Sequence, residues 1–383
     1  CNFHYGTIHL SFYMRWHMVA QLNARQRFVR TLTGKEVDHV PFMRIFGSAN
    51  YALPSWLEKR PNLSVYMDKL IGFEGAYRGW AIVPVNYGLY GLPPDVCLDD
   101  KGPIHIYKNG IGEIRTWTKN NDYHSGILEY ALKTADDWDR IRPYVLCDTD
   151  KRIPSDIDEL AQFYANRDYP LQLTCGGVYG FIRRLAGDEN LGYMFYDSPE
   201  AVKEIISEYI DMLLNLWERL CSRIQFDLIE SWEDMAYKCG SIISPEHFSK
   251  FLAPQYRKIR AFADAHNIPV LLVDSDGNID DLAEWMYKAG VNAMYPFESL
   301  AGCNPANVRR KLPGMAGIGG LNKDCMAHGK KEMDEELEKA IGLIKLGRFI
   351  PGPDHMVLSN VSFENYRYFM TRLKDIILHT KPY

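Results

Sequence analysis

Short runs of apolar residues recur along the chain, and each ends in a polar cluster that is followed by a helical pattern. The clearest examples span residues 227–234, 269–277 and 348–355. A strand followed by a helix, repeated along a chain, builds a parallel sheet. The same pattern predicts further strands at 40–47, 171–177, 291–296 and 315–322, and helices at 199–223, 244–266, 279–289, 331–346 and 362–379.

These segments make seven or eight strand–helix units. Polar residues end nearly every strand instead of gathering at one point where the strand order reverses. That distribution favours a closed barrel over a doubly wound sheet. We therefore expect an α/β protein built as a single distorted (β/α)8 TIM barrel.

Residues 76–146 interrupt this rhythm and are rich in glycine, proline and tyrosine. Within them, residues 104–118 predict a hairpin with a turn at Asn109-Gly110. We expect a lid-like insertion near the barrel mouth, which is the end where the carboxyl ends of the strands meet. The insertion is too irregular to predict a second domain.

The first 17 residues are rich in aromatic side chains and lack the basic start and apolar centre of a secretory signal. Asn23, shortly after Met18, is placed to cap a short amphipathic helix. We expect residues 1–17 to be a non-native or disordered extension, and residues 18–383 to form the barrel domain.

Composition adds limits on partners and location. The formal net charge of −5 gives no general attraction to nucleic acid or to an anionic membrane. No apolar run approaches the roughly 18 residues that span a bilayer. The eight cysteines are scattered and form no C-x-x-C pair, so a reducing cytoplasm is the expected setting.

In a barrel of this kind, side chains just past the strand ends converge on one mouth. We therefore expect an acid-rich site there, although its members are far apart in the sequence. Its predicted members are Glu233, Asp234, Asp274, Asp276 and His355.

The acids in this set differ in their predicted roles. Glu233 and Asp234 are neighbours and point to opposite faces, so one enters the mouth while the other caps a loop or forms a structural ion pair. Asp274 and Asp276 share one face, and their mutual repulsion requires a cation or a raised pKa. The alternative for this pair is a turn ahead of Gly277 together with a cap for the next helix.

Other polar residues are candidates for the same pocket. His355 is expected to be a metal ligand or a proton donor. Arg44 is expected to bind a substrate carboxylate or phosphate, unless it is a buried structural arginine. Tyr179 and Asn322 are expected to line the substrate pocket, with helix capping as the alternative for Asn322.

Several of these motifs together resemble the uroporphyrinogen decarboxylase superfamily, which includes cobalamin-dependent methyltransferases and, more distantly, cobalamin-independent methionine synthase. The resemblance covers residues 22–378 and implies a distorted (β/α)8 barrel that forms a homodimer. It rests on the segments 23–28, 40–44, 233–240, 243–245, 276–278, 319–323, 350–355 and 363–366.

Two departures from the family pattern bear on the reaction. Arg44 matches the first arginine of the segment with which true decarboxylases bind their acidic tetrapyrrole, but Ser48 stands in place of the second. The zinc-binding His-x-Cys pair of the methyltransferase branch falls on Asp274 and Asp276, and its last cysteine falls near His355. The resemblance thus implies a metal site without thiolates, for which zinc remains the expected ion.

The leading hypothesis is an enzyme that moves a methyl group between a small methylated substrate and a corrinoid carried by a separate protein. Asp274, Asp276 and His355 would hold the metal, with Glu233 as a further ligand or a general base. The second hypothesis is a metal-free decarboxylase of a carboxylated pyrrolic substrate, in which Arg44 grips a carboxylate and Asp234 or His355 moves protons. The third is a non-catalytic protein that binds a tetrapyrrole or corrinoid.

Overall fold

A computed structural model of the chain describes residues 21–46, 52–76, 79–118, 125–147 and 149–382. The predicted extension at residues 1–17 lies outside these residues. Asn23 caps the first helix, α1 (Ala24–Thr33), as predicted: its side chain accepts a hydrogen bond from the Gln26 amide, and the Gln26 side chain bonds back to Asn23.

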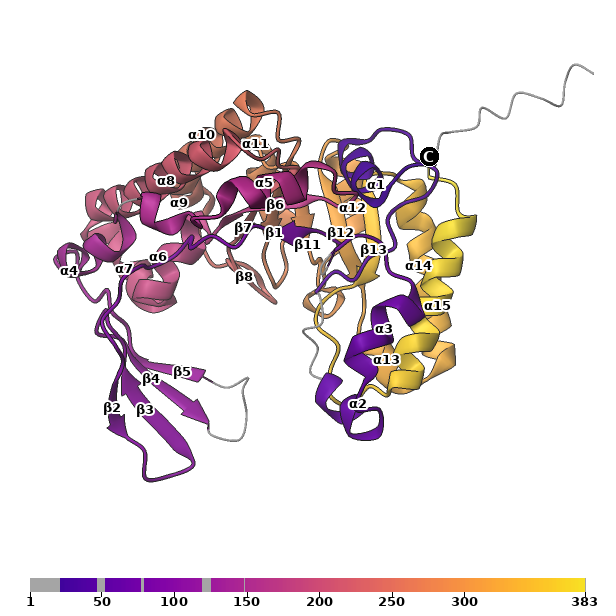
Figure 1. The fold of residues 1–383 in the computed structure, drawn as a ribbon, viewed down its shortest axis with the longest axis horizontal. Helices are drawn as coiled ribbons and strands as arrows, with labels where there is room; N and C mark the ends of the chain where they lie inside the picture. Colours follow the sequence, from indigo (N-terminus) through magenta and orange to yellow (C-terminus); the bar gives the residue numbers. More distant parts are fainter. Residues whose placement is uncertain (1–20, 47–51, 77–78, 119–124, 148, 383) are drawn as a thin grey trace, which may run out of the picture.

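A curled sheet of seven parallel strands lies at the centre of the fold, in the order β1-β6-β7-β10-β11-β12-β13 (Figure 1). Neighbours in this order are also successive strands of the sheet along the chain, as expected for repeated strand–helix units. The strands are β1 (Ala81–Ile82), β6 (Leu171–Cys175), β7 (Leu228–Trp232), β10 (Val270–Asp274), β11 (Ala293–Tyr295), β12 (Ala316–Leu321) and β13 (Phe349–Pro353).

The predicted first strand does not form, because residues 40–44 join no ladder of hydrogen bonds in the structure. Pro41 has no amide hydrogen to donate, which weakens strand pairing at this point. Met43 and Ile45 nevertheless point into the same interior as the strands. The described residues therefore form a curled seven-stranded sheet, and the eightfold closure of a full barrel is not confirmed.

The strands β7 and β10 to β13 each contribute to two apolar layers, whereas the apolar residues of β6 all lie in the outer one. The inner layer fills the concave side, where Phe28 and Leu32 of α1 join residues of the strands such as Leu272 and Ile318. The outer layer packs against helices (Figure 1). Both layers are almost free of exposed surface, so the centre of the sheet is a packed core.

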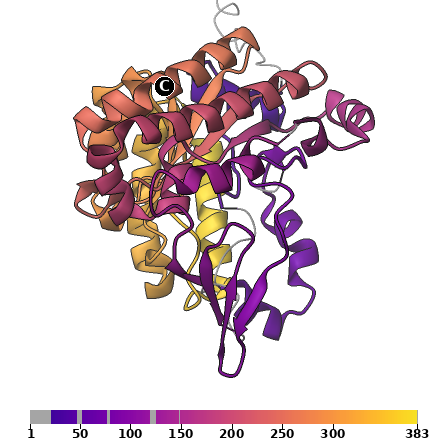
Figure 2. The same cartoon turned by 90° about the vertical axis from the view of Figure 1, so that its left-hand side faces the viewer.

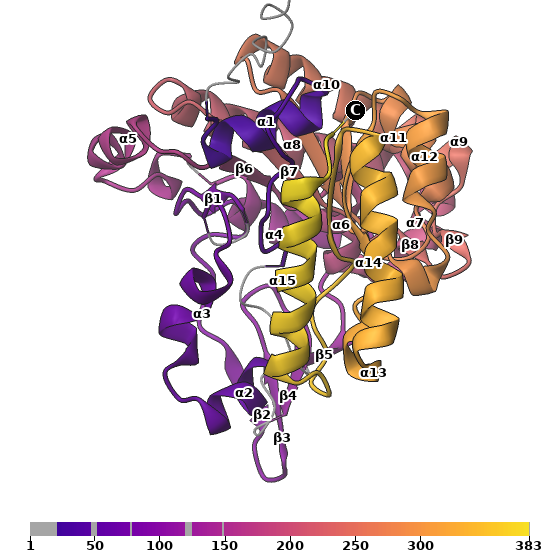
Figure 3. The ribbon, with the colours of Figure 1, turned by 90° about the vertical axis from the view of Figure 1, so that its right-hand side faces the viewer.

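The helices that follow the strands agree closely with those predicted. Ser244 caps its helix through the His247 amide, and Ser362 caps the last helix through the Asn365 amide. Figure 3 shows α14 and α15 side by side. These helices are α8 (Pro199–Cys221), α9 (Pro245–His247), a π-turn at Phe248–Leu252, α10 (Ala253–Ala265), α11 (Asp280–Lys288), α14 (Lys330–Lys345) and α15 (Phe363–His379).

Shorter helices fill the remaining connections. They are α2 (Leu53–Lys59), α3 (Leu63–Ile71), α4 (Asp137–Val145), α5 (Ile157–Ala165), α6 (Val178–Ala186), α7 (Asp188–Asp197), α12 (Pro305–Lys311) and α13 (Cys325–His328). Among the described residues, no helix combines the length and apolar character needed to cross a membrane.

The insertion is larger than the predicted hairpin. It forms a four-stranded antiparallel sheet of β2 (Val96–Asp99), β3 (Ile104–Lys108), β4 (Ile114–Thr118) and β5 (Ser125–Glu129). This sheet projects away from the helices, on the side of the molecule where β8 (Ala236–Tyr237) also lies (Figures 1 and 2).

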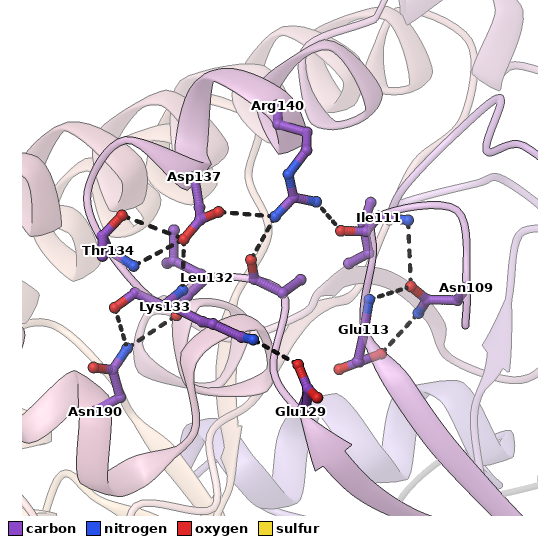
Figure 4. A network of polar contacts seen from close by, with 11 residues as sticks. Asn109, Ile111, Glu113, Glu129, Leu132, Lys133, Thr134, Asp137, Arg140 and Asn190 are labelled. Atoms are coloured by element: carbon purple, nitrogen blue, oxygen red, sulfur yellow. Dashed lines mark hydrogen bonds and ion pairs between the residues drawn. The ribbon is translucent and has the colours of Figure 1, made fainter. Parts of the chain in front are cut away.

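The predicted turn between β3 and β4 is a five-residue loop, since Lys108 pairs with Ile114. Asn109 organises this loop by accepting hydrogen bonds from the amides of Ile111 and Glu113 (Figure 4). Arg140 of α4 then donates to the carbonyl of Ile111 and ties the insertion to the helical layer.

Candidate functional site

Four of the five predicted residues, Asp234, Asp274, Asp276 and His355, come together at the carboxyl ends of the strands. Asp276 and His355, which follow β10 and β13, lie 3.2 Å apart between Oδ2 and Nε2. The ligand atoms of Asp276, Glu298 and His355 all lie within 4.8 Å of one another, and those of Asp234, Asp274 and Asp276 do so as well. Asp276 therefore belongs to both groups.

Glu298 was not among the predicted site residues. It lies just past the short strand β11, which ends at Tyr295. The rule that identified the other acids, a polar residue beyond a strand end, applies to Glu298 also. Glu298 lies two residues beyond the predicted strand at 291–296, so the same rule could have identified it.

Gly277 fixes the backbone between the two groups. Its φ of +84° is in the left-handed region, and a Cβ there would lie 2.4 Å from the carbonyl oxygen of Ala236. In this conformation the Gly277 amide donates a 2.9 Å hydrogen bond to Oε2 of Glu298. The glycine thus brings the loop after β10 to the loop that carries Glu298.

The crowded carboxylates change one another's ionisation. Burial, and then the charge of Asp276, raise the pKa of Asp234 to about 6. Burial, together with the charges of Glu230, Asp276 and Asp234, raises the pKa of Asp274 well above its ordinary value. Burial lowers the pKa of His355, but the hydrogen bond and charge of Asp276 outweigh it, so the net shift is upward. These shifts indicate that a positive charge placed among the carboxylates would be stabilised by them.

Asp234 and His355 are each held by their surroundings. Asp234 has a φ of +45°, an uncommon conformation for a residue other than glycine that recurs at functional sites. The ring of Phe46 lies 5.0 Å from the imidazole of His355, centroid to centroid. Both side chains remain about one-fifth exposed, so a solute can reach them.

Glu233 does not join the cluster, although a role as metal ligand or base was predicted for it. Its carboxylate is fully buried and accepts hydrogen bonds from five donors, which are the amides of Val178, Tyr179 and Gly180 and the hydroxyls of Ser231 and Tyr256. Three of these donors are the otherwise unpaired amides at the start of α6. Of the two neighbouring acids, Asp234 enters the mouth and Glu233 anchors a helix.

The three predicted substrate-binding residues are also engaged within the protein. Nη1 of Arg44 lies 2.8 Å from Asp68 of α3. The Tyr179 hydroxyl donates to Asp188 at 3.0 Å. Oδ1 of Asn322 accepts from the Asp324 amide, which closes a turn ahead of α13; the N-cap residue of that helix is Asp324 and not Asn322.

Two cationic side chains lie beside the cluster. Nη2 of Arg183, from α6, is 3.4 Å from Oδ2 of Asp234. Nζ of Lys323 is 3.8 Å from Oδ1 of the buried Asp354, next to His355 in the chain. Lys323 follows the end of β12, where a residue of the site is expected, but nothing in the helical pattern of α6 singles out Arg183.

Comparison with known proteins assigns the chain to a family. The family model for uroporphyrinogen decarboxylase (URO-D) matches residues 126–376. The chain belongs to the uroporphyrinogen decarboxylase family, and the resemblance seen in the sequence is confirmed. No curated protein matches the sequence.

One solved structure supports the architecture. A methyltransferase from Methanosarcina mazei is similar, with a TM-score of 0.58 and 16% identity over 92% of this chain and 99% of that chain. A putative vitamin-B12 independent methionine synthase from Listeria monocytogenes is more distant, with a TM-score of 0.33 and 13% identity over 58% of this chain and 70% of that chain. At such identities the first likeness concerns the fold alone, and the second carries no argument.

Proposed function

We propose that this protein is a metal-assisted methyltransferase that moves a methyl group between a small methylated substrate and a corrinoid carried by a separate protein. The observation that carries the proposal is the set of donor atoms on Asp276, Glu298 and His355, gathered within 4.8 Å at the end of the sheet. Membership of the family and the fold shared with a methyltransferase support it.

The donor set fits a divalent ion such as Zn²⁺. Two carboxylates and an imidazole are ordinary zinc ligands, and Asp274 is near enough to Asp276 to add another oxygen. The bound ion would act as a Lewis acid toward the atom that carries the methyl group. Because these donors are harder than thiolates, the site suits a methyl group bound to oxygen or nitrogen better than one bound to sulfur.

The protein's own groups would orient the substrate and move protons. Asp234 accepts a long, 3.4 Å hydrogen bond from the Asp276 amide and faces Arg183. These contacts place the Asp234 carboxyl at the edge of the donor set. There it is positioned to exchange a proton with the substrate atom that loses or gains the methyl group. Phe46 and Trp232 supply apolar surface beside His355 and Arg183 respectively.

The proposal is tested by mixing the zinc-loaded protein with reduced cobalamin and a panel of methyl ethers, methylamines and methyl thioethers. Formation of methylcobalamin is followed by its absorption spectrum. The wild-type protein should methylate cobalamin from at least one ether or amine, and Asp276→Asn should slow the reaction at least about tenfold. Asp281→Asn, at an exposed aspartate of α11, should not change it. Release of CO₂ from a porphyrinogen without any methyl transfer would refute the proposal.

That last outcome belongs to the decarboxylase alternative, which has less support from the geometry. The carboxylate anchor expected for it, Arg44, is paired with Asp68 of α3. A homodimer, a corrinoid-carrying partner and a cytoplasmic location remain predictions from the sequence.

A further inference from the structure

Arg183 is the cationic side chain that most directly faces the acidic cluster from α6. Its Nη2 lies 3.4 Å from Asp234, and its Nη1 lies 3.8 Å from Oδ2 of Asp188. Both separations exceed the 2.7–2.9 Å that is usual for a charge-assisted hydrogen bond. The side chain is only one-fifth exposed, so these loose contacts are not those of a solvated surface arginine.

The guanidinium also has hydrogen-bonding capacity to spare. It carries five N–H donors. Nε is buried and has no partner among the described residues, and Nη2 makes the one contact within hydrogen-bonding distance. Buried donors are normally satisfied, so this guanidinium has donors left for an added acceptor.

The surroundings hold Arg183 in place without using up its donors. Asp188 is itself bound by the hydroxyls of Tyr179 and Tyr237, at 3.0 and 3.4 Å. The guanidinium carbon of Arg183 lies 5.9 Å from the centre of the Trp232 ring, and that of Arg184 lies 4.9 Å from it. Arg184, by contrast, donates to the carbonyls of Gly176 and Gly180 and is thereby occupied.

We propose that Arg183 binds a carboxylate of the substrate and so selects small methylated acids, which have the transferable methyl group and the carboxylate on one molecule. A planar guanidinium pairs with a carboxylate through two parallel hydrogen bonds, a geometry that lysine lacks. This inference rests on the proposed function. Asp234 contacts both Arg183 and the Asp276 amide, each at 3.4 Å, so a short substrate would reach both the arginine and the donor set.

Because the site is acidic, binding of a substrate carboxylate should depend on whether a divalent ion is bound. Asp234, Asp274, Asp276 and Glu298 would repel a carboxylate, and a bound divalent ion offsets that repulsion. The binding experiment therefore uses zinc-loaded protein, with the zinc content of every variant measured. The probes are methoxyacetate and 2-methoxyethanol, which have the same methyl ether and differ in the carboxylate.

Calorimetric titration should show that the wild-type protein binds methoxyacetate at least tenfold more tightly than 2-methoxyethanol. Arg183→Gln should reduce this ratio below threefold at equal zinc occupancy, and Arg184→Gln should leave it unchanged. Arg183→Lys, which keeps the charge and loses the planar fork, should give an intermediate ratio. It also serves as the test if Arg183→Gln fails to fold or to hold zinc.

A wild-type ratio near one would overturn the inference, as would an undiminished ratio in Arg183→Gln or, in its place, in Arg183→Lys. A ratio that is high but equal in all variants would assign carboxylate binding to the metal instead, and would overturn it too. Because these are binding measurements, they give a result whether or not the protein transfers methyl groups. Failure of the proposed function would appear separately, in the cobalamin assay.

Discussion

Nε2 of His355 lies 3.2 Å from Oδ2 of Asp276, although two strands, β11 and β12, separate the strands that these residues follow. In a flat sheet, strands three positions apart would lie about 14 Å from each other. The contact therefore depends on the curl of the sheet, which turns the strand ends toward a common centre. This relationship makes it possible for one ion to be held by residues from distant parts of the chain.

The first prediction concerns Glu233, which we expect to contribute to stability and not to metal binding. Glu233→Gln replaces an acceptor of five hydrogen bonds with a side chain that can accept fewer of them and adds a donor facing other donors. Urea denaturation should show a loss of roughly 2–4 kcal/mol.

The matched control is Glu189→Gln, at an exposed residue of α7, which should change stability by less than about 0.5 kcal/mol. The folded Glu233→Gln protein should still bind zinc. A variant as stable as the wild type that has lost its zinc would show that Glu233 belongs to the metal site after all.

The second prediction concerns acid sensitivity. Arg27 of α1 contacts Glu74 and Asp38 at 2.8 Å, and His39 contacts Glu74 at 2.8 Å. Burial raises the pKa of both acids, but the hydrogen bonds and charges of Arg27 and His39 outweigh it, so both pKa values are lowered. A carboxylate with a lowered folded-state pKa stabilises the protein above the unfolded pKa, about 4, and loses this contribution as the pH falls through the folded value.

The free energy of unfolding should therefore decrease below about pH 4, and Glu74→Gln should remove part of that decrease, on the order of 1 kcal/mol. Urea titrations between about pH 3 and 6 measure this slope. Glu58→Gln, at an exposed position of α2, is the control and should follow the wild type. Identical slopes for Glu74→Gln and the wild type would contradict the assignment.

The third prediction concerns Gly277. Gly277→Ala places a methyl group 2.4 Å from the Ala236 carbonyl in a backbone conformation that alanine disfavours. We expect a loss of about 1–3 kcal/mol in stability. Since the Gly277 amide also holds Glu298, zinc affinity should fall at least about tenfold.

Gly342 offers the comparison, because it lies inside α14 and a Cβ there meets nothing within 4 Å. Gly342→Ala should leave zinc binding unchanged and stabilise the protein by roughly 0.5–1 kcal/mol. If Gly277→Ala bound zinc as well as Gly342→Ala, the link between this turn and the donor set would be disproved.

The strands and helices after residue 170 could be predicted because each apolar run is short, fully buried and bounded by polar or glycine residues. The meeting of Asp276 and His355 followed from the same pattern, since parallel strands end on one side. The strand predicted at 40–47 does not form among the described residues, because the side chains of this segment alternate like those of a strand while Pro41 weakens its pairing. The strands β2 and β5 escaped prediction because their side chains are largely exposed on both faces and give no alternation.

The side chains of the site were harder to predict than its location. The direction of Arg44 depends on which face of its segment packs inward, and the sequence shows only that the faces differ. Glu233 and Asp234 presented the same difficulty. Only the position of α6 shows that Glu233, and not Asp234, binds the amides at the start of that helix. Arg183 lies within an amphipathic helix, where its pattern is that of any surface arginine.

The central claim is that Asp276 and His355 act together in holding a divalent ion, and a double-mutant cycle on zinc binding tests it most directly. Zinc affinity would be measured by competition with a chelator for the wild type, Asp276→Asn, His355→Ala and the double variant. We predict that each single change weakens zinc binding about 10- to 100-fold. The fold-loss in the double variant should be much smaller than the product of the two single fold-losses, because both residues belong to the same site. Wild-type protein that binds no zinc, or single variants that bind it as tightly as the wild type, would contradict the claim.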